Sequence, residues 1–473
     1  MHLKEKIETR KARGAVIGLG YVGLPLLVEF AKAGYDAVGI DLDQNKVNQI
    51  GKGISYIQDV PGEELNEYVQ SGKLSATTDY SVLKDADIIS ICVPTPLRKS
   101  KSPDISYIVD ACSKVAKYLT RGQLIILEST TYPGSTEEVV LPILLGKFQG
   151  EEYTEICAGK VLSETQGIMA ESTAGQGSHK QLEGNGLKIG EDFYLAFSPE
   201  RVDPGNDKYK TKNIPKVIGG VTSQCCELST LFYKQLFPEI VPVSSTRAAE
   251  MVKLLENTFR SVNIALANEM KMMCDALDLN IWEIIEAAAT KPFGFMPFYP
   301  GPGLGGHCIP IDPLYLIWKA KLHGIEPKFV ELAGELNQKM PGYVVSGMQN
   351  KLNEICKSIK GSRILVVGVA YKKDISDMRE SPALEIITLL KEKGADVSYY
   401  DPYIPEFAGD GLEMSSIEYN EENLKGFDGI IIATDHSNID YGLIINNCKV
   451  LVDTRNAIVR YKNKNYDKVS NSI

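Results

Sequence analysis

The sequence predicts an α/β protein with two doubly wound parallel-sheet domains joined by a long central helical region. Near each end of the 473-residue chain, an apolar strand pattern runs into a tight turn, a helix pattern and a second strand, at 14–41 and at 363–401. Between them, residues 247–276 follow the pattern of one long helix. A chain of this length is too long for one ordinary domain. We expect three domains, spanning residues 1–220, 221–345 and 346–473.

Composition and charge exclude several classes of protein. The formal net charge of −10 argues against a nucleic-acid binder, which would be basic. No apolar run approaches the roughly 18 to 20 residues of a membrane span, and residues 1–8 lack the apolar core of a signal peptide. Nine cysteines without regular spacing fit neither a disulfide framework nor a metal site. We therefore expect a cytoplasmic protein with no nucleic-acid, membrane or metal partner.

The first strand–turn–helix unit predicts a dinucleotide site. Its turn reads Gly18-Leu19-Gly20-Tyr21-Val22-Gly23, and the second strand closes on Asp41. Gly18 makes the tight turn, Gly20 lets the backbone approach a pyrophosphate, and Gly23 lets the helix pack closely on the strand. The helix N-terminus offers N–H groups to the phosphates. Asp41 would accept the ribose hydroxyls and repel a 2′-phosphate, which favours NAD over NADP; Tyr21 and Val22 are counted with the cofactor site.

Three further residues are predicted beside the cofactor. Lys46, one turn into the next helix pattern, would reach the adenosine side or be merely solvated. Thr95 and Thr130 follow two buried strand patterns, and ligands of such sheets lie beyond the carboxyl ends of the strands. Their alternative role is helix capping. The pattern is then lost from about 146 to 186, which indicates an irregular insert within the first domain.

The central helix pattern carries a lysine and an amide on one face, Lys253 and Asn257. Their apolar neighbours on this helix are Met251, Leu254, Leu255 and Phe259. We expect these neighbours to bury the surrounding surface, and a buried lysine needs a partner or a chemical role. Lys253 could stabilise an oxyanion or move a proton while Asn257 holds an oxygen. The alternative is a lysine whose ammonium group reaches solvent at the helix rim.

A loop rich in glycine and proline follows at 299–313 and contains a single thiol, Cys308. Its four glycines and four prolines exclude a helix or a central strand, so we expect a rigid, shaped loop. A thiolate displayed there would be a strong nucleophile. The alternative is a connector with an incidental cysteine.

The last third predicts a second long helical region at 325–355, interrupted near Pro341-Gly342, and then a small parallel sheet. The sheet strands are expected at 363–370, 397–400, 429–434 and 450–453. The turn after the first of these strands lacks the full glycine pattern, so a second dinucleotide is not expected.

Motifs along the whole chain resemble those of the UDP-glucose/GDP-mannose dehydrogenase family. In family order they are the run 18–25, Val93-Pro94-Thr95-Pro96, Glu128-Ser129-Thr130, Ser198-Pro199-Glu200-Arg201, Lys253-Leu254-Leu255-Glu256-Asn257, the run 305–313, Tyr371-Lys372-Lys373-Asp374 and Arg379-Glu380-Ser381. The resemblance implies two Rossmann-like domains, one for NAD and one for a UDP-sugar. It also implies a homodimer through the central helices.

The same resemblance implies a chemistry in which the C6 alcohol of the sugar is oxidised to a carboxylate with two NAD. Cys308 would trap the intermediate aldehyde as a thiohemiacetal, whose oxidation gives a thioester. Lys253 and Asn257 would contact the substrate, move protons and stabilise the oxyanion. Glu200 and Asp312 would position or activate water, with Glu200 as the better candidate for the hydrolytic base. The group that takes the first alcohol proton, water or lysine, is left open.

Further roles follow from the same family. Lys372 would contact the substrate, and Arg379 would reach the nicotinamide cofactor. Arg201 would donate to an acetamido carbonyl or a phosphate, and Tyr299 and Gly305 are assigned to the substrate side of the thiol loop.

The choice of sugar rests on two loops, at 199–206 and 302–310, which resemble the N-acetylhexosamine branch of the family and its gluco-configured type. UDP-GalNAc, UDP-ManNAc and UDP-glucose remain alternatives. The insert departs from that branch. Two other functions stay open: a two-electron NAD dehydrogenase of a hydroxy acid, which has no use for Cys308, and a catalytically silent sugar-nucleotide sensor.

Overall fold

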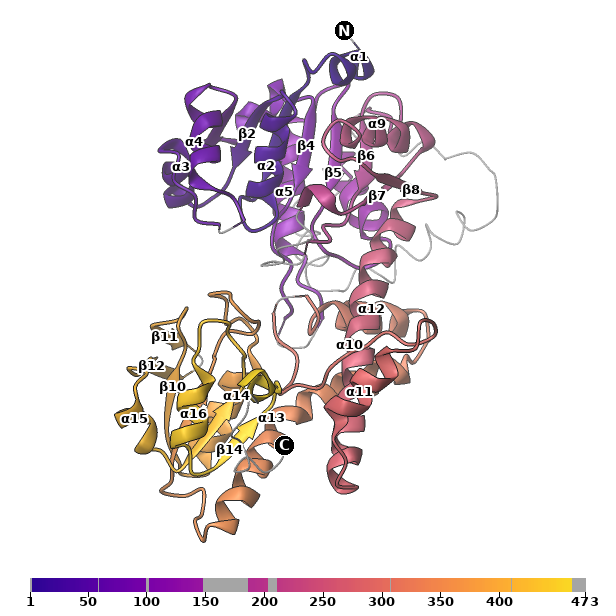
Figure 1. Ribbon diagram of the computed structural model, residues 1–473. Coiled ribbons are helices and arrows are strands. Elements are labelled where there is room, and N and C mark those ends of the chain that lie inside the picture. The colour runs from indigo at the N-terminus through magenta and orange to yellow at the C-terminus, as the bar shows by residue number, and fades with distance from the viewer. Residues whose placement is uncertain are drawn as a thin grey trace. The chain divides into compact units, whose positions relative to one another are not determined.

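A computed structural model describes residues 2–57, 59–98, 102–147, 186–202, 211–306, 308–409 and 411–461. The predicted insert lies almost entirely outside the described residues, as do 203–206 of the loop that bears on the choice of sugar. The chain divides into two compact units: a first unit of residues 1–255 with 314–322, and a second unit of 256–313 with 323–473. Each unit contains one main sheet, drawn in Figure 1 from indigo to magenta in the first and from orange to yellow in the second.

The first unit is built on an eight-stranded sheet of order β3-β2-β1-β4-β5-β6-β7-β8. Its strands are β1 (Arg13–Ile17), β2 (Asp36–Ile40), β3 (Leu74–Thr77), β4 (Ile88–Ile91), β5 (Leu124–Leu127), β6 (Tyr194–Phe197), β7 (Lys216–Gly220) and β8 (Ile240–Val243). The first six strands in chain order are mutually parallel, which confirms the predicted doubly wound class. The pair β7 and β8 differs from the prediction, because β7 runs antiparallel to β6.

The helices of the first unit cover the sheet, whose central strands are buried on both faces. They are α1 (Leu3–Glu8), α2 (Gly23–Lys32), α3 (Gln44–Gly51), α4 (Gly62–Gln70), α5 (Ser106–Tyr118), α6 (Leu141–Leu144), α9 (Ser223–Tyr233), the start of α10 (Thr246–Ala276) and most of α12 (Asp312–Leu322). All four residues of β4 and of β5 are buried, as apolar runs without polar alternation require. The expected boundary at 220 is wrong, because α9 and β8 extend the same sheet and its cover.

A buried carboxylate fastens the beginning of α10 to the first unit. Glu250 accepts hydrogen bonds from the backbone N–H of Gly134 at 2.5 Å and of Thr136 at 2.9 Å. The hydroxyls of Ser135 and Thr136 also donate to it, at 2.9 and 2.7 Å. Because these residues begin the short helical stretch after β5, the carboxylate lies where free N–H groups and a partial positive charge favour it.

The second unit combines helices with a four-stranded parallel sheet of order β10-β9-β13-β14. Its strands are β9 (Arg363–Val367), β10 (Asp396–Tyr400), β13 (Gly429–Ile432) and β14 (Leu451–Asp453), and its helices are α11 (Ile281–Ala289), α13 (Lys328–Glu354), α14 (Pro382–Glu392), α15 (Glu421–Lys425) and α16 (Tyr441–Asn447), with the rest of α10. The four predicted strands are therefore present. An antiparallel hairpin, β11 (Glu406–Gly409) with β12 (Leu412–Ser415), was not predicted.

The interruption expected near Pro341-Gly342 is wrong, because α13 continues through Pro341. Proline removes one helical hydrogen bond, the one to the carbonyl of Asn337. That turn of α13 is fixed by other contacts. The Asn337 side chain donates to the carbonyl of Ser261 at 3.0 Å and accepts from Asn268 at 2.9 Å, which ties α13 to α10.

The apolar neighbours of Lys253 differ from expectation in their burial. Leu254 is buried, but Met251, Leu255 and Phe259 are exposed, with 59% of Leu255 accessible. Their spacing on α10 is the amphipathic spacing that the sequence shows, and the structure places them on an uncovered side of the helix. No helix in the described ranges combines the length and the apolar character needed to cross a membrane.

Candidate active site

The glycine turn between β1 and α2 has the shape that a dinucleotide requires. Gly18 has φ +88°, and a Cβ there would lie 2.5 Å from the carbonyl oxygen of Cys92. A Cβ on Gly23 would lie 1.8 Å from the carbonyl oxygen of Gly18. At Gly20 a Cβ would meet no described atom within 4 Å, so the backbone is open to a ligand. Glycine is thus needed for packing at Gly18 and Gly23, and for access at Gly20.

Asp41 ends β2 beside this turn and is held by protein donors. Its Oδ2 accepts from the N–H of Leu19 at 2.8 Å and from Lys46 Nζ at 3.2 Å, and its Oδ1 accepts from the N–H of Asp43 at 2.9 Å. The structure therefore brings Lys46 to the carboxylate predicted to bind the adenosine ribose. Of these donors only Lys46 is a flexible side chain that can give up its position to a ribose hydroxyl. Tyr21 is exposed on the turn, and Val22 stands at the N-cap position of α2 without a side-chain hydrogen bond to the helix. These residues fit NAD.

Lys253 and Thr130 meet in the first unit. The ammonium group of Lys253 donates to the Thr130 hydroxyl, and Lys253 is only 8% exposed. Burial of this lysine was predicted, and its partner is the threonine that follows β5. Thr95 contributes its carbonyl oxygen, which accepts a hydrogen bond from the Tyr315 hydroxyl at 2.7 Å and so links the end of β4 to α12.

Glu200 lies in a buried group of charges that the motifs did not reveal. Its Oε1 accepts from the N–H groups of Arg201 at 2.7 Å and Val202 at 2.9 Å. Its Oε2 lies 3.0 Å from Lys216 Nζ, which also contacts Glu128 at 2.7 Å. The guanidinium of Arg201 donates to the carbonyl of Pro215 at 2.8 Å, so its predicted contact with substrate remains a prediction.

The thiol loop is clamped to the segment 371–382 of the second unit. The N–H of Gly306 donates to the carbonyl of Arg379 at 2.9 Å. A Cβ on Gly305 would lie 2.5 Å from the Cβ of Tyr371 and 3.0 Å from the carbonyl oxygen of Glu380. As expected, the described residues of this loop form neither helix nor strand before α12, which begins at Asp312; its rigidity stays a prediction. Two motifs far apart in sequence, 305–313 and 371–381, thus pack directly against each other.

Cys308 lies at the end of this loop, one turn before α12. Its thiol is half-buried, and its carbonyl oxygen accepts from the N–H groups of Ile311 at 3.1 Å and Asp312 at 2.8 Å. Asp312 is 1% exposed, and its Oδ2 accepts from the Asn257 amide at 2.5 Å. Three predicted catalytic residues are therefore linked in the second unit. That Cys308 meets Lys253 stays a prediction, because the two belong to different units.

The predicted substrate and cofactor residues of the second unit lie on the same clamped segments. Arg379 is held by Asp377 through a two-pronged contact, Nε to Oδ1 at 3.0 Å and Nη2 to Oδ2 at 2.6 Å, and is half-exposed. Lys372 is half-buried on the turn after β9. Tyr299 is exposed and stacks on Trp282, with ring centroids 5.8 Å apart and ring planes at 15°.

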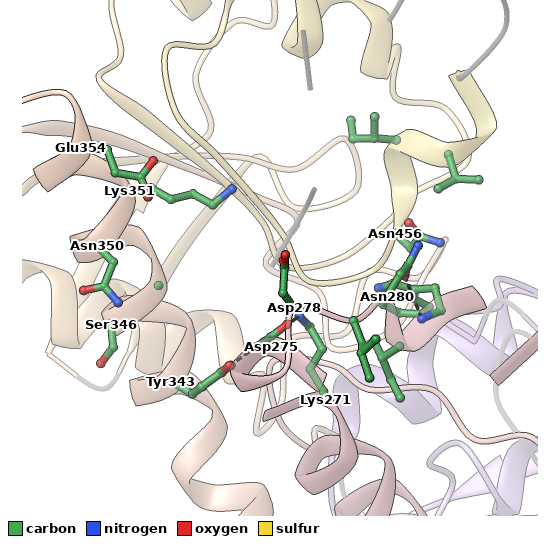
Figure 2. A pocket seen from close by; sticks show the side chains of 16 residues that line it. Lys271, Asp275, Asp278, Asn280, Tyr343, Ser346, Asn350, Lys351, Glu354 and Asn456 are labelled. Atoms are coloured by element: carbon green, nitrogen blue, oxygen red, sulfur yellow. Dashed lines mark hydrogen bonds and ion pairs between the residues drawn. The ribbon is translucent and has the colours of Figure 1, made fainter. Parts of the chain in front are cut away.

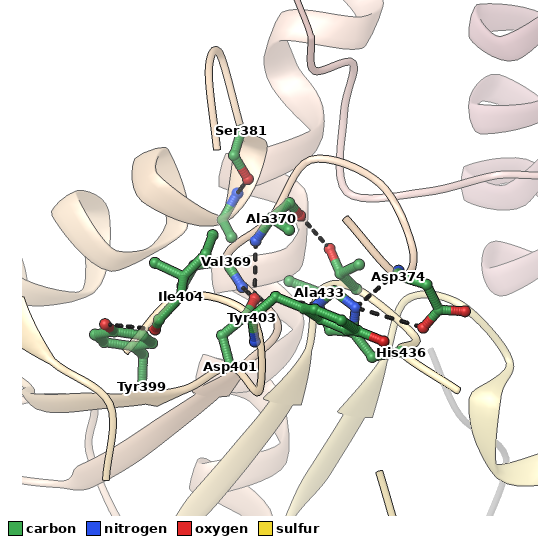
Figure 3. A network of polar contacts seen from close by, with 12 residues as sticks. Val369, Ala370, Asp374, Ser381, Tyr399, Asp401, Tyr403, Ile404, Ala433 and His436 are labelled. Carbon is green, nitrogen blue, oxygen red and sulfur yellow. Dashed lines mark hydrogen bonds and ion pairs between the residues drawn. The ribbon is translucent and has the colours of Figure 1, made fainter. Parts of the chain in front are cut away.

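A buried polar network shapes the turn that carries Lys372 (Figure 3). Asp401, which follows β10, accepts from the N–H groups of Val369 at 2.7 Å and Ala370 at 3.0 Å. His436 Nε2 donates to the same carboxylate oxygen at 3.1 Å, and Nδ1 accepts from the N–H of Asp374 at 2.9 Å. Burial would raise the pKa of Asp401, but the His436 hydrogen bond and the backbone donors outweigh it and lower that pKa.

Asp401 occupies the position in this domain that Asp41 occupies in the first. Its carboxylate is buried and already holds His436 and two backbone N–H groups. It is therefore less able than Asp41 to accept ribose hydroxyls. The absence of a second dinucleotide remains a prediction, to which this contact adds a physical reason.

A cavity of about 460 Å³ opens between the end of α10, the start of α11 and α13 in the second unit (Figure 2). Its charged residues include Lys271, which pairs with Asp275, and the Tyr343 hydroxyl donates to the same carboxylate at 2.5 Å. None of the predicted site residues lines it. The cavity is thus separate from the groups assigned to chemistry.

Comparison with known proteins matches all three domains of the UDP-glucose/GDP-mannose dehydrogenase family: the NAD binding domain over residues 12–158, the central domain over 247–339 and the UDP binding domain over 365–460. A UDP-N-acetyl-D-glucosamine 6-dehydrogenase from Pseudomonas aeruginosa is 33% identical over 89% of this chain and 90% of its own. A UDP-N-acetyl-D-mannosamine dehydrogenase from Pyrococcus horikoshii is 34% identical over 94% and 96%. The solved structure of UDP-D-ManNAc dehydrogenase from Pyrococcus horikoshii has a TM-score of 0.78 at 32% identity, covering 94% of this chain and 96% of the other. These relatives differ in the sugar that they are named for.

Proposed function

Because the chain belongs to the UDP-glucose/GDP-mannose dehydrogenase family and is an NAD-dependent UDP-sugar dehydrogenase, we propose that it oxidises C6 of a UDP-N-acetylhexosamine to the uronic acid. UDP-N-acetyl-D-glucosamine is the first candidate, from the two loops that resemble that type and from the relative in Pseudomonas aeruginosa. UDP-N-acetyl-D-mannosamine is the second, from the relative in Pyrococcus horikoshii. The observation that carries a four-electron reaction is Cys308 on a loop clamped at Gly305 and Gly306, one turn before the buried Asp312.

The residues of this chain divide the reaction among them. The turn 18–23 and Asp41 would hold NAD, which would supply the acceptor for the hydride that leaves the substrate carbon. Lys253 moves a proton and stabilises the developing oxyanion, and the Thr130 hydroxyl orients its ammonium group. The Cys308 sulfur bonds to the aldehyde carbon and gives a thiohemiacetal, which is again an alcohol that can lose hydride. Asp312, held by Asn257, fixes the turn that presents the thiol.

Hydrolysis completes the cycle. Glu200 accepts a proton from water as the water oxygen bonds to the thioester carbon, and the bond from carbon to Cys308 sulfur breaks. In sum, one alcohol, two NAD⁺ and one water give one carboxylate, two NADH and three protons. Oxidation to the aldehyde alone would consume a single NAD⁺, so the stoichiometry distinguishes the two reactions.

The remaining predicted contacts complete the proposal. On the substrate side, Lys372 binds the UDP moiety, Arg201 donates to the acetamido group or a phosphate, and Tyr299 and Gly305 line the sugar side of the thiol loop. On the cofactor side are Tyr21, Val22, Lys46, Thr95 and Arg379. The placement of Lys46 on Asp41 and of Gly305 against Tyr371 supports these assignments.

The test is a panel of UDP-GlcNAc, UDP-ManNAc, UDP-GalNAc and UDP-glucose, with NADH counted by absorbance and uronic acid by mass spectrometry. We expect the highest kcat/KM with UDP-GlcNAc and two NADH per sugar consumed. Cys308→Ser should accumulate a covalent oxygen ester, because an alkoxide leaves less readily than a thiolate. One NADH per sugar, or full turnover by Cys308→Ala, would contradict the thioester route.

We also propose that the protein is a homodimer through the central helices. In the second unit, α10 and the residue after it expose an apolar stripe of Phe259, Leu266, Met270, Met273 and Leu277. Such a stripe is typical of a partner surface. Leu266→Glu with Met273→Glu should convert the protein to a monomer in analytical ultracentrifugation, whereas Val241→Glu, at an exposed apolar residue of β8, should leave the dimer intact. A wild-type protein that sediments as a monomer would contradict the proposal.

A further inference from the structure

The reversed strand β7 brings a buried lysine to the edge of the sheet where Glu200 lies. β7 pairs antiparallel with β6, Phe197 opposite Gly219. The first residue of β7, Lys216, therefore lies at the same edge as the residues that follow β6. In a parallel strand the first residue would lie at the opposite edge. Strand direction thus decides that Lys216 faces Glu200.

Lys216 is held between two carboxylates. Its Nζ lies 3.0 Å from Oε2 of Glu200 and 2.7 Å from Oε2 of Glu128, while the Tyr233 hydroxyl donates to the other oxygen of Glu128. Lys216 is 4% exposed and Glu128 1%. The rings of Tyr233 and Phe237 each lie 5.6 Å from Nζ, where an aromatic face attracts a cation. The ammonium group has little freedom to move away from Glu200.

These contacts orient the Glu200 carboxylate. Both acceptor directions of Oε1 are used by the N–H groups of Arg201 and Val202. On Oε2, Lys216 uses one direction, and no other described group is bonded there. A carboxylate has about four acceptor positions. Among the described residues, one acceptor position on Oε2 is thus left, and from it Glu200 can take a proton.

The charges around Glu200 favour its ionised form. Burial would raise the pKa of Glu200, but the charge and hydrogen bond of Lys216, the Arg201 N–H and the charge of Lys253 outweigh burial and lower that pKa. Burial would lower the pKa of Lys216, but Glu128 and Glu200 outweigh it and raise that pKa. A cation and an anion therefore face each other at neutral pH.

The other titratable groups at this edge do not replace Lys216. Burial raises the pKa of Cys92 and of Tyr233 well above their ordinary values, so both are neutral at working pH. Burial also raises the pKa of Glu128, the second carboxyl group on Lys216. Of the described cations, Lys216 is the one in hydrogen-bond contact with Glu200.

We propose that Lys216 is a positioning residue for thioester hydrolysis, holding Glu200 as an oriented carboxylate that accepts the proton of the attacking water. This inference rests on the proposed function and adds a residue to it. Lys216 acts through Glu200 and needs no contact with substrate. In the step, the water oxygen bonds to the thioester carbon, its proton passes to Glu200, and the Cys308 sulfur leaves as thiolate.

The main test is Lys216→Met, which keeps much of the side-chain volume and removes the charge. Without the ammonium group the pKa of Glu200 rises, so Glu200 is protonated up to a higher pH. The acid limb of the pH profile of kcat therefore shifts to higher pH. We expect a shift of about one pH unit or more, which is a loss of about tenfold on the acid side. The first turnover should keep a fast burst of NADH, because the oxidative steps do not use this base. Lys216→Arg should restore the acid limb.

Two further variants separate positioning from folding. Lys216→Met combined with Glu128→Gln removes one charge of each sign and leaves an amide oxygen for Tyr233; the same shift is expected. Lys319→Met is the matched control, because Lys319 is also buried in the first unit and bonds Glu138 at 2.7 Å. It should lower Tm and leave the acid limb in place.

A folded single or double variant with the wild-type acid limb, or with a profile lowered equally at every pH, would overturn the assignment. A wild-type enzyme that yields one NADH per sugar would instead overturn the proposed function. The two failures are distinguishable, because the first is measured on variants and the second on the wild type.

Discussion

Replacing Gly305 by alanine tests whether the thiol loop is held by its contact with the segment 371–382. The added Cβ would lie 2.5 Å from Tyr371 Cβ, 3.0 Å from the Glu380 carbonyl oxygen and 3.2 Å from Pro382 Cδ. Non-bonded carbon atoms prefer about 3.5 to 4.0 Å, so the loop must move by about 1 Å. The neighbours are backbone, a Cβ and a proline ring, which cannot swing aside. Overpacking of this kind costs about 1 to 3 kcal/mol of stability.

The displacement should affect catalysis more than stability, because Cys308 lies three residues further along the loop. A misplacement of about 1 Å in a reacting group costs about 100-fold in rate. We therefore expect kcat of Gly305→Ala to fall by about 100-fold, with a lower Tm and an altered rate of Cys308 alkylation.

The matched control for this experiment is Gly342→Ala in α13, where an added Cβ meets no atom within 4 Å. Alanine there should raise stability by about 0.5 to 1 kcal/mol and leave kcat unchanged. The unfolded chain has less conformational freedom at alanine than at glycine, so less entropy is lost when the helix forms. Wild-type kcat and Tm in Gly305→Ala would refute the view that close packing positions the thiol.

Three other perturbations give distinct readouts. Asp41→Ala should weaken NAD binding by about 10- to 150-fold and reduce discrimination against NADP, as measured by calorimetric titration, because a charged hydrogen bond contributes about 1.5 to 3 kcal/mol; unchanged affinity for both nucleotides would contradict its role. His436→Ala removes the acceptor for the Asp374 N–H and should cost about 1 to 3 kcal/mol of stability, with KM for the UDP-sugar rising more than kcat falls, because the turn of Lys372 loosens. Burial raises the pKa of Glu250 to about 7, against opposing hydrogen bonds. A carboxyl group with a raised folded-state pKa stabilises fully below its unfolded pKa and loses that contribution as pH rises through the folded value. The Tm difference between wild type and Glu250→Gln should therefore shrink between about pH 5 and pH 8 in calorimetry; a constant difference would disprove this.

The parts of the site that the sequence predicted are those whose physical reason is local. Gly18, Gly23 and Asp41 lie within one strand–turn–helix–strand unit, so their spacing alone predicts the turn that the structure shows. The loop before α12 was predictable in the same way, because proline and glycine restrict the backbone wherever they stand. Its clamp on Tyr371 was not predictable, since it joins residues far apart in sequence.

Burial of an apolar stripe is a different case. Leu255 and Phe259 recur on α10 at a spacing that predicts a covered face, and the structure leaves them exposed. The pattern reports only that something apolar is to be covered; it does not distinguish the protein's own core from a second chain. Local sequence also failed to predict that α13 continues through Pro341, because the contacts that stabilise α13 there come from α10.

The antiparallel direction of β7 could have been predicted from the sequence, although not from the residues of the strand itself. Lys216-Val217-Ile218-Gly219-Gly220 fits a strand in either direction. Two neighbouring parallel strands need a long crossover, usually a helix, between them. The connection from β6 to β7 contains Pro199, Pro204 with Gly205, and Pro215, which argue against such a helix and hence favour an antiparallel return. From that direction it follows that the first residue of β7 lies at the end of the sheet where Glu200 lies, so the lysine beside Glu200 was deducible from the prolines before it.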